Sequence, residues 1–303
     1  MNRQYQHVFD KTVRRIFTIL ILCSVTGISN LNAASVSLLL DNKLPQAVFA
    51  AGDIQVALRT RGHNVKLLRL TQFSRVTDGV RIVLSLSSDE DVIRAMKSEG
   101  ARFPGALKSE AYSIRRSSKA GRTAYWAVGV DAGGVMYGGL ELAEVIRVNG
   151  LDDIKDVDHN PYMAMRGTKF NIPLDARTPS YTDVCDAAQN NIAEMWSFEF
   201  WKDYIDNLAR YRYNYISLWS LHPFPSLVKV PDYPDVALDD VKRSTVRWKE
   251  YYSGNGIGFD DPEILNNLET LKKITIDEKI AFWRKVMSYA KGRNIDFYFV
   301  TWN

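Results

Sequence analysis

The sequence predicts an α/β protein with two domains. Apolar runs of strand length alternate with segments whose apolar residues recur at helical spacing, which is typical of sheets with crossover helices. The 303 residues are 46% hydrophobic, 24% charged and 12% aromatic, close to the globular average. This composition excludes disordered, collagen-like and coiled-coil classes. At roughly 100–200 residues per domain, the length suggests two domains that can each bury a core.

Residues 1–33 have the pattern of a secretory signal peptide. A basic Arg-Arg pair precedes a 13-residue apolar run, Ile16–Ile28, whereas a membrane-spanning helix needs about 20 residues. Small residues at Ala33 and Ala34 are typical of a cleavage site. We therefore expect cleavage after one of these alanines, export to the periplasm or the exterior, and no stable membrane span afterwards. An uncleaved membrane anchor is the alternative.

The charge distribution gives no sign of a nucleic-acid partner. The formal net charge is +4, and residues 1–33 carry +3 of it, so the remainder is nearly neutral. A near-neutral surface lacks the basic patch that binds a polyanion. Cys185 alone would remain after cleavage, so we expect no internal disulfide. The four histidines are scattered, which predicts no zinc site, and no pattern indicates a cofactor.

Residues 35–160 are predicted to form the first domain, a small α/β unit of about five strands and three helices. Strands are expected at 36–40, 64–70, 80–86, 111–115 and 123–130. Helices are expected at 46–61, at 89–97 with Ser88 as N-cap, and from the glycine turn to Ile146. Asp158–Pro161 is expected to be a linker-like turn.

Glycines cluster between positions 129 and 139, after a strand and at the start of a helix. A dinucleotide-binding fingerprint occupies the same setting. Here no Gly-x-Gly-x-x-Gly register fits, and the element closes its domain instead of opening it. Gly138 and Gly139 would each cost about 1 kcal/mol in a helix unless close packing requires them. We therefore favour a packing role and keep a dinucleotide-binding enzyme as an alternative.

Residues 161–303 are predicted to form the second domain, in which strands and helices alternate. Strands are expected at 166–173, 213–219 and 295–302. Helices are expected from the Ser197 cap to about 212, and from the Thr275–Glu278 capping box to about 292. This order indicates parallel strands. Helical spacing places Trp196, Trp201 and Trp283 in the core, and 221–273 is expected to be a long connection.

Two motifs carry a resemblance to a known family. Gly129-x-Asp131-x-x-Gly134-x-x-Tyr137-Gly138-x-x-x-Leu142-x-Glu144 resembles the end of the small α/β domain in front of many glycoside hydrolase barrels. These include the β-N-acetylhexosaminidases (family 20) and the α-glucuronidases, in which this domain supports the barrel and is not catalytic. Arg166-Gly167 resembles the Arg-Gly that begins the first barrel strand of the hexosaminidases, where the arginine holds sugar hydroxyls. Those enzymes carry an Asp where this chain has Asn171.

The resemblance implies that residues 161–303 open a (β/α)8 barrel. Such a barrel has eight units in about 250 residues and its active site at the carboxyl ends of the strands. Roughly two and a half units are present, so these residues form either a small open α/β domain or part of a longer enzyme. We favour the second and expect a C-terminally truncated fragment. Sugars offer C–H faces to aromatic rings and hydroxyls to planar polar groups. The candidate substrate contacts are Arg166, Asn171, Asp175, Arg177, Trp219, His222, Trp302 and Asn303.

The alternatives at these positions are structural. Arg166 could form a domain-interface salt bridge, and Trp219 and Trp302 could belong to the core. Overall the sequence predicts an exported glycoside hydrolase acting on a polysaccharide or glycan, with its carboxylate pair beyond this fragment. No catalytic residue is assigned. A non-catalytic glycan-binding protein is the main alternative, and the sugar, its anomeric configuration, the stereochemistry and the oligomeric state stay open.

Overall fold

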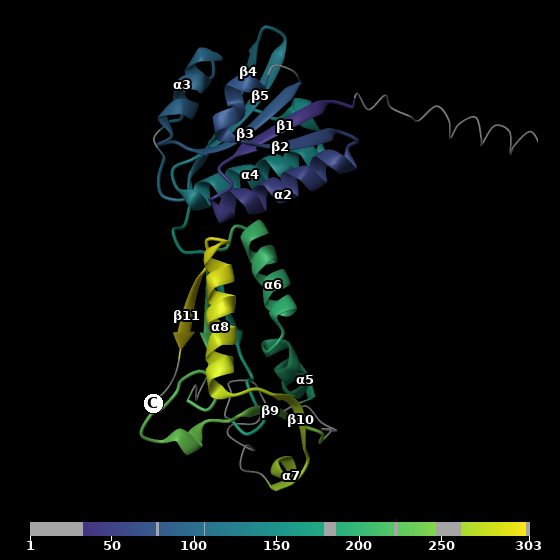
Figure 1. Cartoon of the computed structure of the whole chain (residues 1–303), viewed down its shortest axis with the longest axis vertical. Helices are drawn as coiled ribbons and strands as arrows, with labels where there is room; N and C mark the ends of the chain where they lie inside the picture. The colour runs from purple at the N-terminus through teal and green to yellow at the C-terminus, as the bar shows by residue number, and fades with distance from the viewer. Residues whose placement is uncertain are drawn as a thin grey trace, which may run out of the picture.

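The chain forms two α/β units stacked end to end (Figure 1). The computed structural model describes residues 33–76, 79–105, 107–178, 186–220, 224–246 and 262–300. The expected signal peptide lies outside these residues, apart from Ala33. Across the described segments, every helix is too short or too polar to cross a membrane.

A six-stranded sheet forms the first unit, in the order β2-β1-β3-β5-β4-β6. The strands are β1 (Ser35–Leu40), β2 (Asn64–Arg69), β3 (Val80–Leu86), β4 (Tyr112–Lys119), β5 (Arg122–Gly129) and β6 (Val157–His159). β2, β1, β3 and β5 run parallel, and β4 is antiparallel to both of its neighbours. The expected linker turn was partly wrong. Asp158 and His159 instead pair with β4 as a sixth strand.

Helices cover both faces of this sheet. α2 (Pro45–Thr60) and α4 (Ala132–Val148) lie side by side on one face (Figure 1), where they bury the larger part of the core. α3 (Glu90–Ser98) and the 3-10 helix η1 (Leu70–Arg75) pack on the other face around Trp126. The carboxylate of Asp89 accepts hydrogen bonds from the N–H groups of Asp91 and Val92. The N-cap of α3 is therefore Asp89 and not the expected Ser88.

The glycines between β5 and α4 allow close packing. A Cβ on Gly134 would lie 2.1 Å from the carbonyl oxygen of Ala111, and one on Gly139 would lie 2.7 Å from the Cβ of Ala50. Asp131 caps α4 by accepting a hydrogen bond from the N–H of Gly134 at 2.9 Å. A dinucleotide phosphate would bind at such a helix N-terminus. Here the protein's own carboxylate occupies it, which favours the packing interpretation over a cofactor site.

The second unit contains a three-stranded parallel sheet in the order β11-β8-β7. Its strands are β7 (Gly167–Asn171), β8 (Tyr215–Trp219) and β11 (Asp296–Val300). Its long helices are α5 (Asp186–Met195), α6 (Phe198–Arg210) and α8 (Ile276–Lys291). The ring centroids of Trp201 and Trp283 lie 5.2 Å apart, and that of Trp196 is 6.2 Å from Trp283. These three tryptophans are buried, as the sequence predicts.

Local helix signals were confirmed, whereas a hairpin was missed. Ser197 caps α6, and Thr275 and Glu278 form the expected capping box of α8. The long connection after β8 contains η3 (Pro234–Val236), β9 (Asp240–Ser244), α7 (Pro262–Leu265) and β10 (Leu268–Lys273). β9 and β10 pair antiparallel. β10 is mostly exposed and carries three charged residues in six, so it lacks the apolar alternation that marks a strand.

The carboxylate of Glu110, in the first unit, binds groups at the amino ends of the strands of the second unit. It accepts hydrogen bonds from the Arg166 guanidinium at 2.5 Å, from the Asn214 amide at 3.0 Å and from the Asn294 amide at 2.6 Å. Arg166 precedes β7, Asn214 precedes β8 and Asn294 lies just before β11. Glu110 therefore holds the amino ends of all three strands, an arrangement that we call the Glu110 clamp. The strands run away from it (Figure 1).

Candidate functional site

One face of the second sheet is polar and aromatic. Side chains alternate between the two faces of a strand. The ring of Phe170 packs on Trp201 and that of Phe299 on Trp283, so the alternate positions face away from the helices. From the strand register, these positions are Lys169, Asn171, Ser217, Trp219, Tyr298 and Val300. Tyr298 is 46% exposed, so this face has no helical layer over it in the described part of the chain.

Trp219 ends β8 at the carboxyl edge of the sheet. Its indole N–H donates to Ser217 Oγ at 2.8 Å, and Lys169 Nζ lies 4.0 Å from the ring centroid. Asn171 lies opposite Trp219 in the strand register. Trp219 is half-buried and is not part of the apolar core. The structure thus brings two predicted contact residues, Asn171 and Trp219, together at this edge. A hydrogen bond and a cation–π contact hold the Trp219 ring in place.

Asp175 and Arg177 hold the loop after β7 in place. The buried Asp175 carboxylate accepts hydrogen bonds from Arg177 Nε at 2.8 Å and from the backbone N–H of Lys242 at 2.9 Å. Arg177 also bonds Asp240 at 2.5 Å. The hydrogen bond to Asp175 raises the pKa of Arg177 despite partial burial. These groups already satisfy one another, so the pair anchors β9 to the loop.

Two charged groups beside this loop were not among the predicted contact residues. Burial alone would raise the pKa of Asp240, but hydrogen bonding and the charges of Arg177 and Lys242 lower it overall. The fully buried Lys279 donates from Nζ to the carbonyl oxygens of Leu238 and Asp240 at 2.6 and 2.8 Å. Burial lowers the pKa of Lys279 to about 8. The sequence did contain a signal for this buried charge, because Lys279 lies on the apolar stripe of α8, four residues before Trp283.

Arg166 lies at the opposite end of the sheet from Trp219. Five residues at about 3.3 Å each put Arg166 and Asn171 on the order of 16 Å apart. Its guanidinium bonds Glu110, and Nε donates to the carbonyl oxygen of Arg212 at 2.8 Å. The structure therefore shows the domain-interface ion pair that was the alternative for Arg166. Its place at the amino end of β7 separates it from the carboxyl edge.

Three predicted contacts, His222, Trp302 and Asn303, lie outside the described residues. Within the described segments, no cluster of three His, Cys, Asp or Glu side chains could hold a metal ion.

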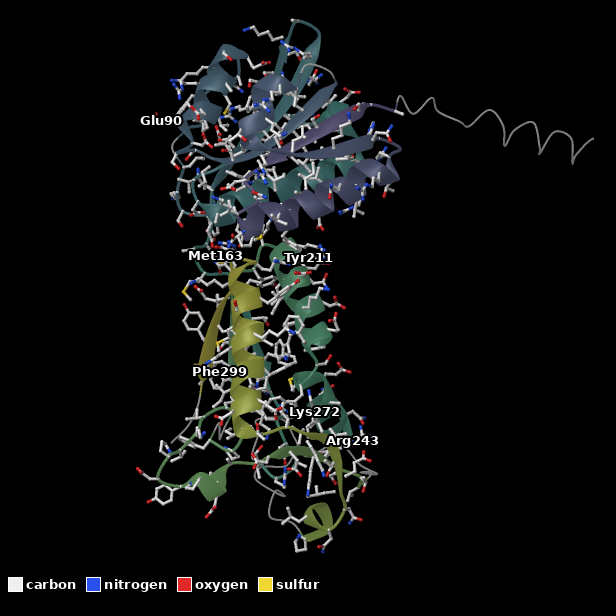
Figure 2. The ribbon with its side chains drawn as sticks, viewed as in Figure 1. Glu90, Met163, Tyr211, Arg243, Lys272 and Phe299 are labelled. Atoms are coloured by element: carbon white, nitrogen blue, oxygen red, sulfur yellow. The ribbon has the colours of Figure 1, made fainter. Side chains whose placement is uncertain are left out.

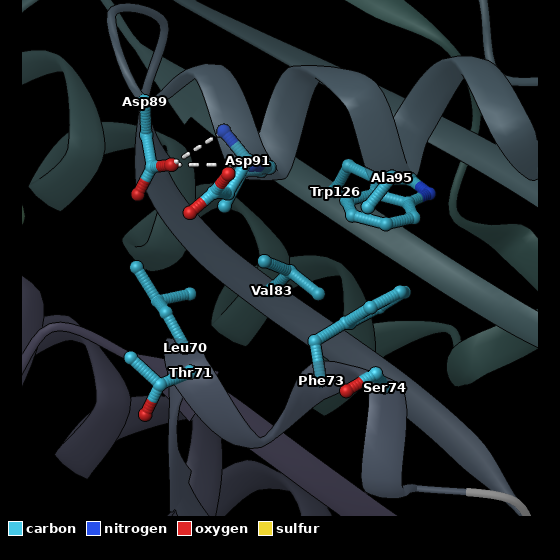
Figure 3. A pocket seen from close by; sticks show the side chains of 10 residues that line it. Leu70, Thr71, Phe73, Ser74, Val83, Asp89, Asp91, Ala95 and Trp126 are labelled. Carbon is cyan, nitrogen blue, oxygen red and sulfur yellow. Dashed lines mark hydrogen bonds between the residues drawn. The ribbon is translucent and has the colours of Figure 1, made fainter.

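The first unit has a cavity of about 300 Å³ between η1 and α3 (Figure 3). Phe73, Val83 and Trp126 give it an apolar floor. Asp89 lies at its rim, where Figure 3 shows its carboxylate bonded to the start of α3. That carboxylate is therefore engaged in capping the helix, and the cavity floor offers apolar contacts.

Comparison with known proteins places the fold but not the family. No protein-family model matches the sequence, and no curated protein matches it. Among solved structures, the chain is similar to a GH138 enzyme targeting pectin rhamnogalacturonan II, with 22% identity and a TM-score of 0.57. The match covers 89% of this chain and 31% of that enzyme, so the chain spans less than a third of its length.

A second similar structure is the GH20 β-N-acetylhexosaminidase from Streptomyces coelicolor A3(2). It has 14% identity and a TM-score of 0.44, and the match covers 88% of this chain and 43% of that one. Because this TM-score is below 0.5, we draw no conclusion from the likeness. The GH138 likeness supports the predicted α/β fold class, since a glycoside hydrolase contains the same arrangement.

Proposed function

We propose that the chain is the amino-terminal part of an exported glycoside hydrolase acting on a polysaccharide or glycan. Residues 35–160 are then its accessory α/β domain, and 161–303 are the opening third of a (β/α)8 catalytic barrel. The carrying observation is the second sheet. Its parallel strands follow one another in chain order, and one face is packed against helices while the other bears Asn171 and Trp219 at the carboxyl edge.

The side on which the helices lie favours a barrel over an open sheet. In doubly wound sheets helices cover both faces, whereas a (β/α)8 barrel has helices only outside and layers of side chains inside. Here Phe170, Phe297 and Phe299 contact α6 or α8 on one face. The opposite face bears polar and aromatic side chains, with Lys169 opposite Ser217 in the strand register, and in this proposal it lines the barrel interior.

In this proposal Trp219 provides a stacking surface for the C–H face of a sugar, and the Asn171 amide bonds a hydroxyl. Asp175 and Arg177 shape the neighbouring loop instead of contacting the sugar. The catalytic carboxylates lie on later strands, separated by about 5–5.5 Å for retention or 6.5–9.5 Å for inversion. Because the GH138 enzyme targets a pectic glycan, pectic polysaccharides are the first substrates to test.

The test requires the reading frame downstream of Asn303. The longest open frame is expressed, and the release of reducing ends is measured on pectic and other cell-wall polysaccharides. Trp219→Ala should lower kcat/KM by about 10- to 100-fold, a loss of about 1.4–2.7 kcal/mol in transition-state binding. Phe103→Ala is the control, because Phe103 is 57% exposed on the first unit.

Two outcomes would contradict this proposal. Equal rates of hydrolysis by the wild type and Trp219→Ala would show that Trp219 does not contact the substrate. Sugar binding without hydrolysis by any extended protein would instead favour the non-catalytic glycan-binding alternative.

Export is a separate part of the proposal and rests on the pattern of residues 1–33. Amino-terminal sequencing of protein secreted by a bacterial host should begin at Ala34 or Ser35. An intact amino terminus in the membrane fraction would support the anchor instead.

A further inference from the structure

A cavity of about 600 Å³ opens at the waist of the molecule, where the two units meet. Its walls come from the second half of α4, from the linker after β6 and from the turn between α6 and β8. We call it the waist groove. Its volume lies within the roughly 300–1,000 Å³ of small-molecule sites. It flanks the amino ends of the strands, away from Trp219.

Two exposed tyrosines stand on different walls of the waist groove. Tyr162, on the linker, is 100% exposed, and Tyr211 is 77% exposed. Figure 2 labels Tyr211 at the end of α6. Between them, the rings of Tyr112 and His159 stack with centroids 5.3 Å apart and an interplanar angle of 21°. Tyrosine combines an apolar ring with a polar hydroxyl, which suits contacts with partly polar ligands. Neither exposed ring is needed for the core.

Planar polar groups lie beside these rings. Arg212 Nη2 is 3.6 Å from a carboxylate oxygen of Glu141 and 3.8 Å from one of Glu144. Both separations exceed hydrogen-bond length. Glu144 is 65% exposed, so its oxygens can accept hydrogen bonds from a ligand. Since each acid of the waist groove has an arginine near it, the groove has little net charge and favours a neutral ligand.

We propose that the waist groove is a second saccharide-binding site, for a neutral oligosaccharide. Tyr162 and Tyr211 stack on sugar rings, and Arg212 and Glu144 bond their hydroxyls. This inference rests on the proposed glycan function. It adds a second place where the protein holds a glycan, at a distance from the proposed active site.

Isothermal titration of the full chain tests the site. The probes are neutral oligosaccharides of four to six sugars derived from galactan, arabinan and xylan, with oligogalacturonate as a charged comparison. Tyr162→Ala and Tyr211→Ala should each weaken neutral-sugar binding about tenfold or more. Tyr233→Ala is the matched control, because this tyrosine is 67% exposed outside the waist groove and should leave binding unchanged. Both test residues are exposed, so the variants should fold.

A Trp219→Ala background separates this site from the carboxyl edge. Neutral-sugar binding that persists in Trp219→Ala and disappears with added Tyr162→Ala supports the waist groove. Unchanged binding in both tyrosine variants, or tighter binding of oligogalacturonate, overturns it. If Trp219→Ala alone abolishes binding and hydrolysis, the proposed function stands and the waist groove fails. If the tyrosine variants lose binding while no extended protein hydrolyses glycans, the groove stands and the hydrolase proposal fails.

Discussion

Replacing Glu110 by alanine removes the carboxylate to which the amino ends of the three strands are bound. The side chains of Glu110 and Arg166 are only 15% and 17% exposed, so the change leaves donors unpaired in a mostly buried place. Breaking a buried ion pair costs about 3–5 kcal/mol. Partial solvent access reduces this, and we expect Glu110→Ala to lower the free energy of unfolding by about 2–4 kcal/mol.

The backbone at Glu110 provides an internal comparison. Its φ is 63°, in the left-handed region, which costs a residue with a Cβ roughly 1–2 kcal/mol. Glu110→Gly loses the same carboxylate and relieves that strain, so it should be about 1 kcal/mol more stable than Glu110→Ala. Glu110→Gln retains one acceptor oxygen, so its loss should be smaller than that of alanine.

Urea unfolding with two probes measures both stability and coupling. Six of the seven tryptophans lie in residues 161–303, so their fluorescence reports mainly the second unit. Far-UV circular dichroism reports both units. In Glu110→Ala the fluorescence midpoint should fall and the two transitions should separate, because the units no longer unfold together.

Glu99→Ala is the control for this experiment. Glu99 and Arg81 form an ion pair of similar burial inside the first unit, with side chains 9% and 3% exposed. Loss of this ion pair should destabilise the protein, while the fluorescence and circular dichroism transitions still shift together. A loss below about 0.5 kcal/mol in Glu110→Ala, with coincident probes, would equal that of an exposed ion pair and would refute the clamp.

Three further changes test the packing and the buried charges. Gly139→Ala should lower the free energy of unfolding by about 1–3 kcal/mol, because its Cβ overpacks against Ala50. At Gly52 a Cβ would meet no atom within 4 Å, so Gly52→Ala should raise that free energy by up to about 1 kcal/mol. Equal shifts in melting temperature would contradict this. Native Lys279, with its pKa lowered to about 8, loses its proton before the unfolded chain does, so wild-type stability should rise relative to Lys279→Met between pH 8 and 10; a constant difference in urea midpoints would contradict this. The lowered pKa of Asp240 stabilises the fold above pH 3.8, so the wild-type advantage over Asp240→Asn should shrink as the pH falls below that value; persistence in acid unfolding would count against it.

Elements with local signals could be predicted from the sequence. The Thr275–Glu278 capping box and the Ser197 cap fix where two helices begin, because these side chains bond backbone groups within the same turn. The apolar run of β3 and the helical spacing of Trp201 and Trp283 fix buried faces by periodicity alone. The close packing of Gly139 against α2 also followed from its unfavourable place within a helix.

Features that depend on distant pairing could not be predicted in the same way. β6 is three residues long and exists because β4 and the Arg115–Asp158 ion pair hold it. The Glu110 clamp joins residues up to 184 positions apart, and no local pattern marks them. Arg166 shows the same limit at closer range. The resemblance put it on the first barrel strand, but only the structure decides that it precedes β7 and faces the first unit.

The two ends of the second sheet therefore differ in the groups that they bury. At the amino end, Glu110 binds charged and amide groups that are mostly buried, so changes there should act on stability. At the carboxyl end, Asp175 and Asp240 are paired with Arg177 and Lys242, so their charges balance. Asn171 and the half-buried Trp219 remain at the edge. Substitution of Trp219 removes no buried ion pair, so its effect should appear in ligand binding more than in unfolding. That separation of effects is what the proposed sugar-binding edge requires of the sheet that supports it.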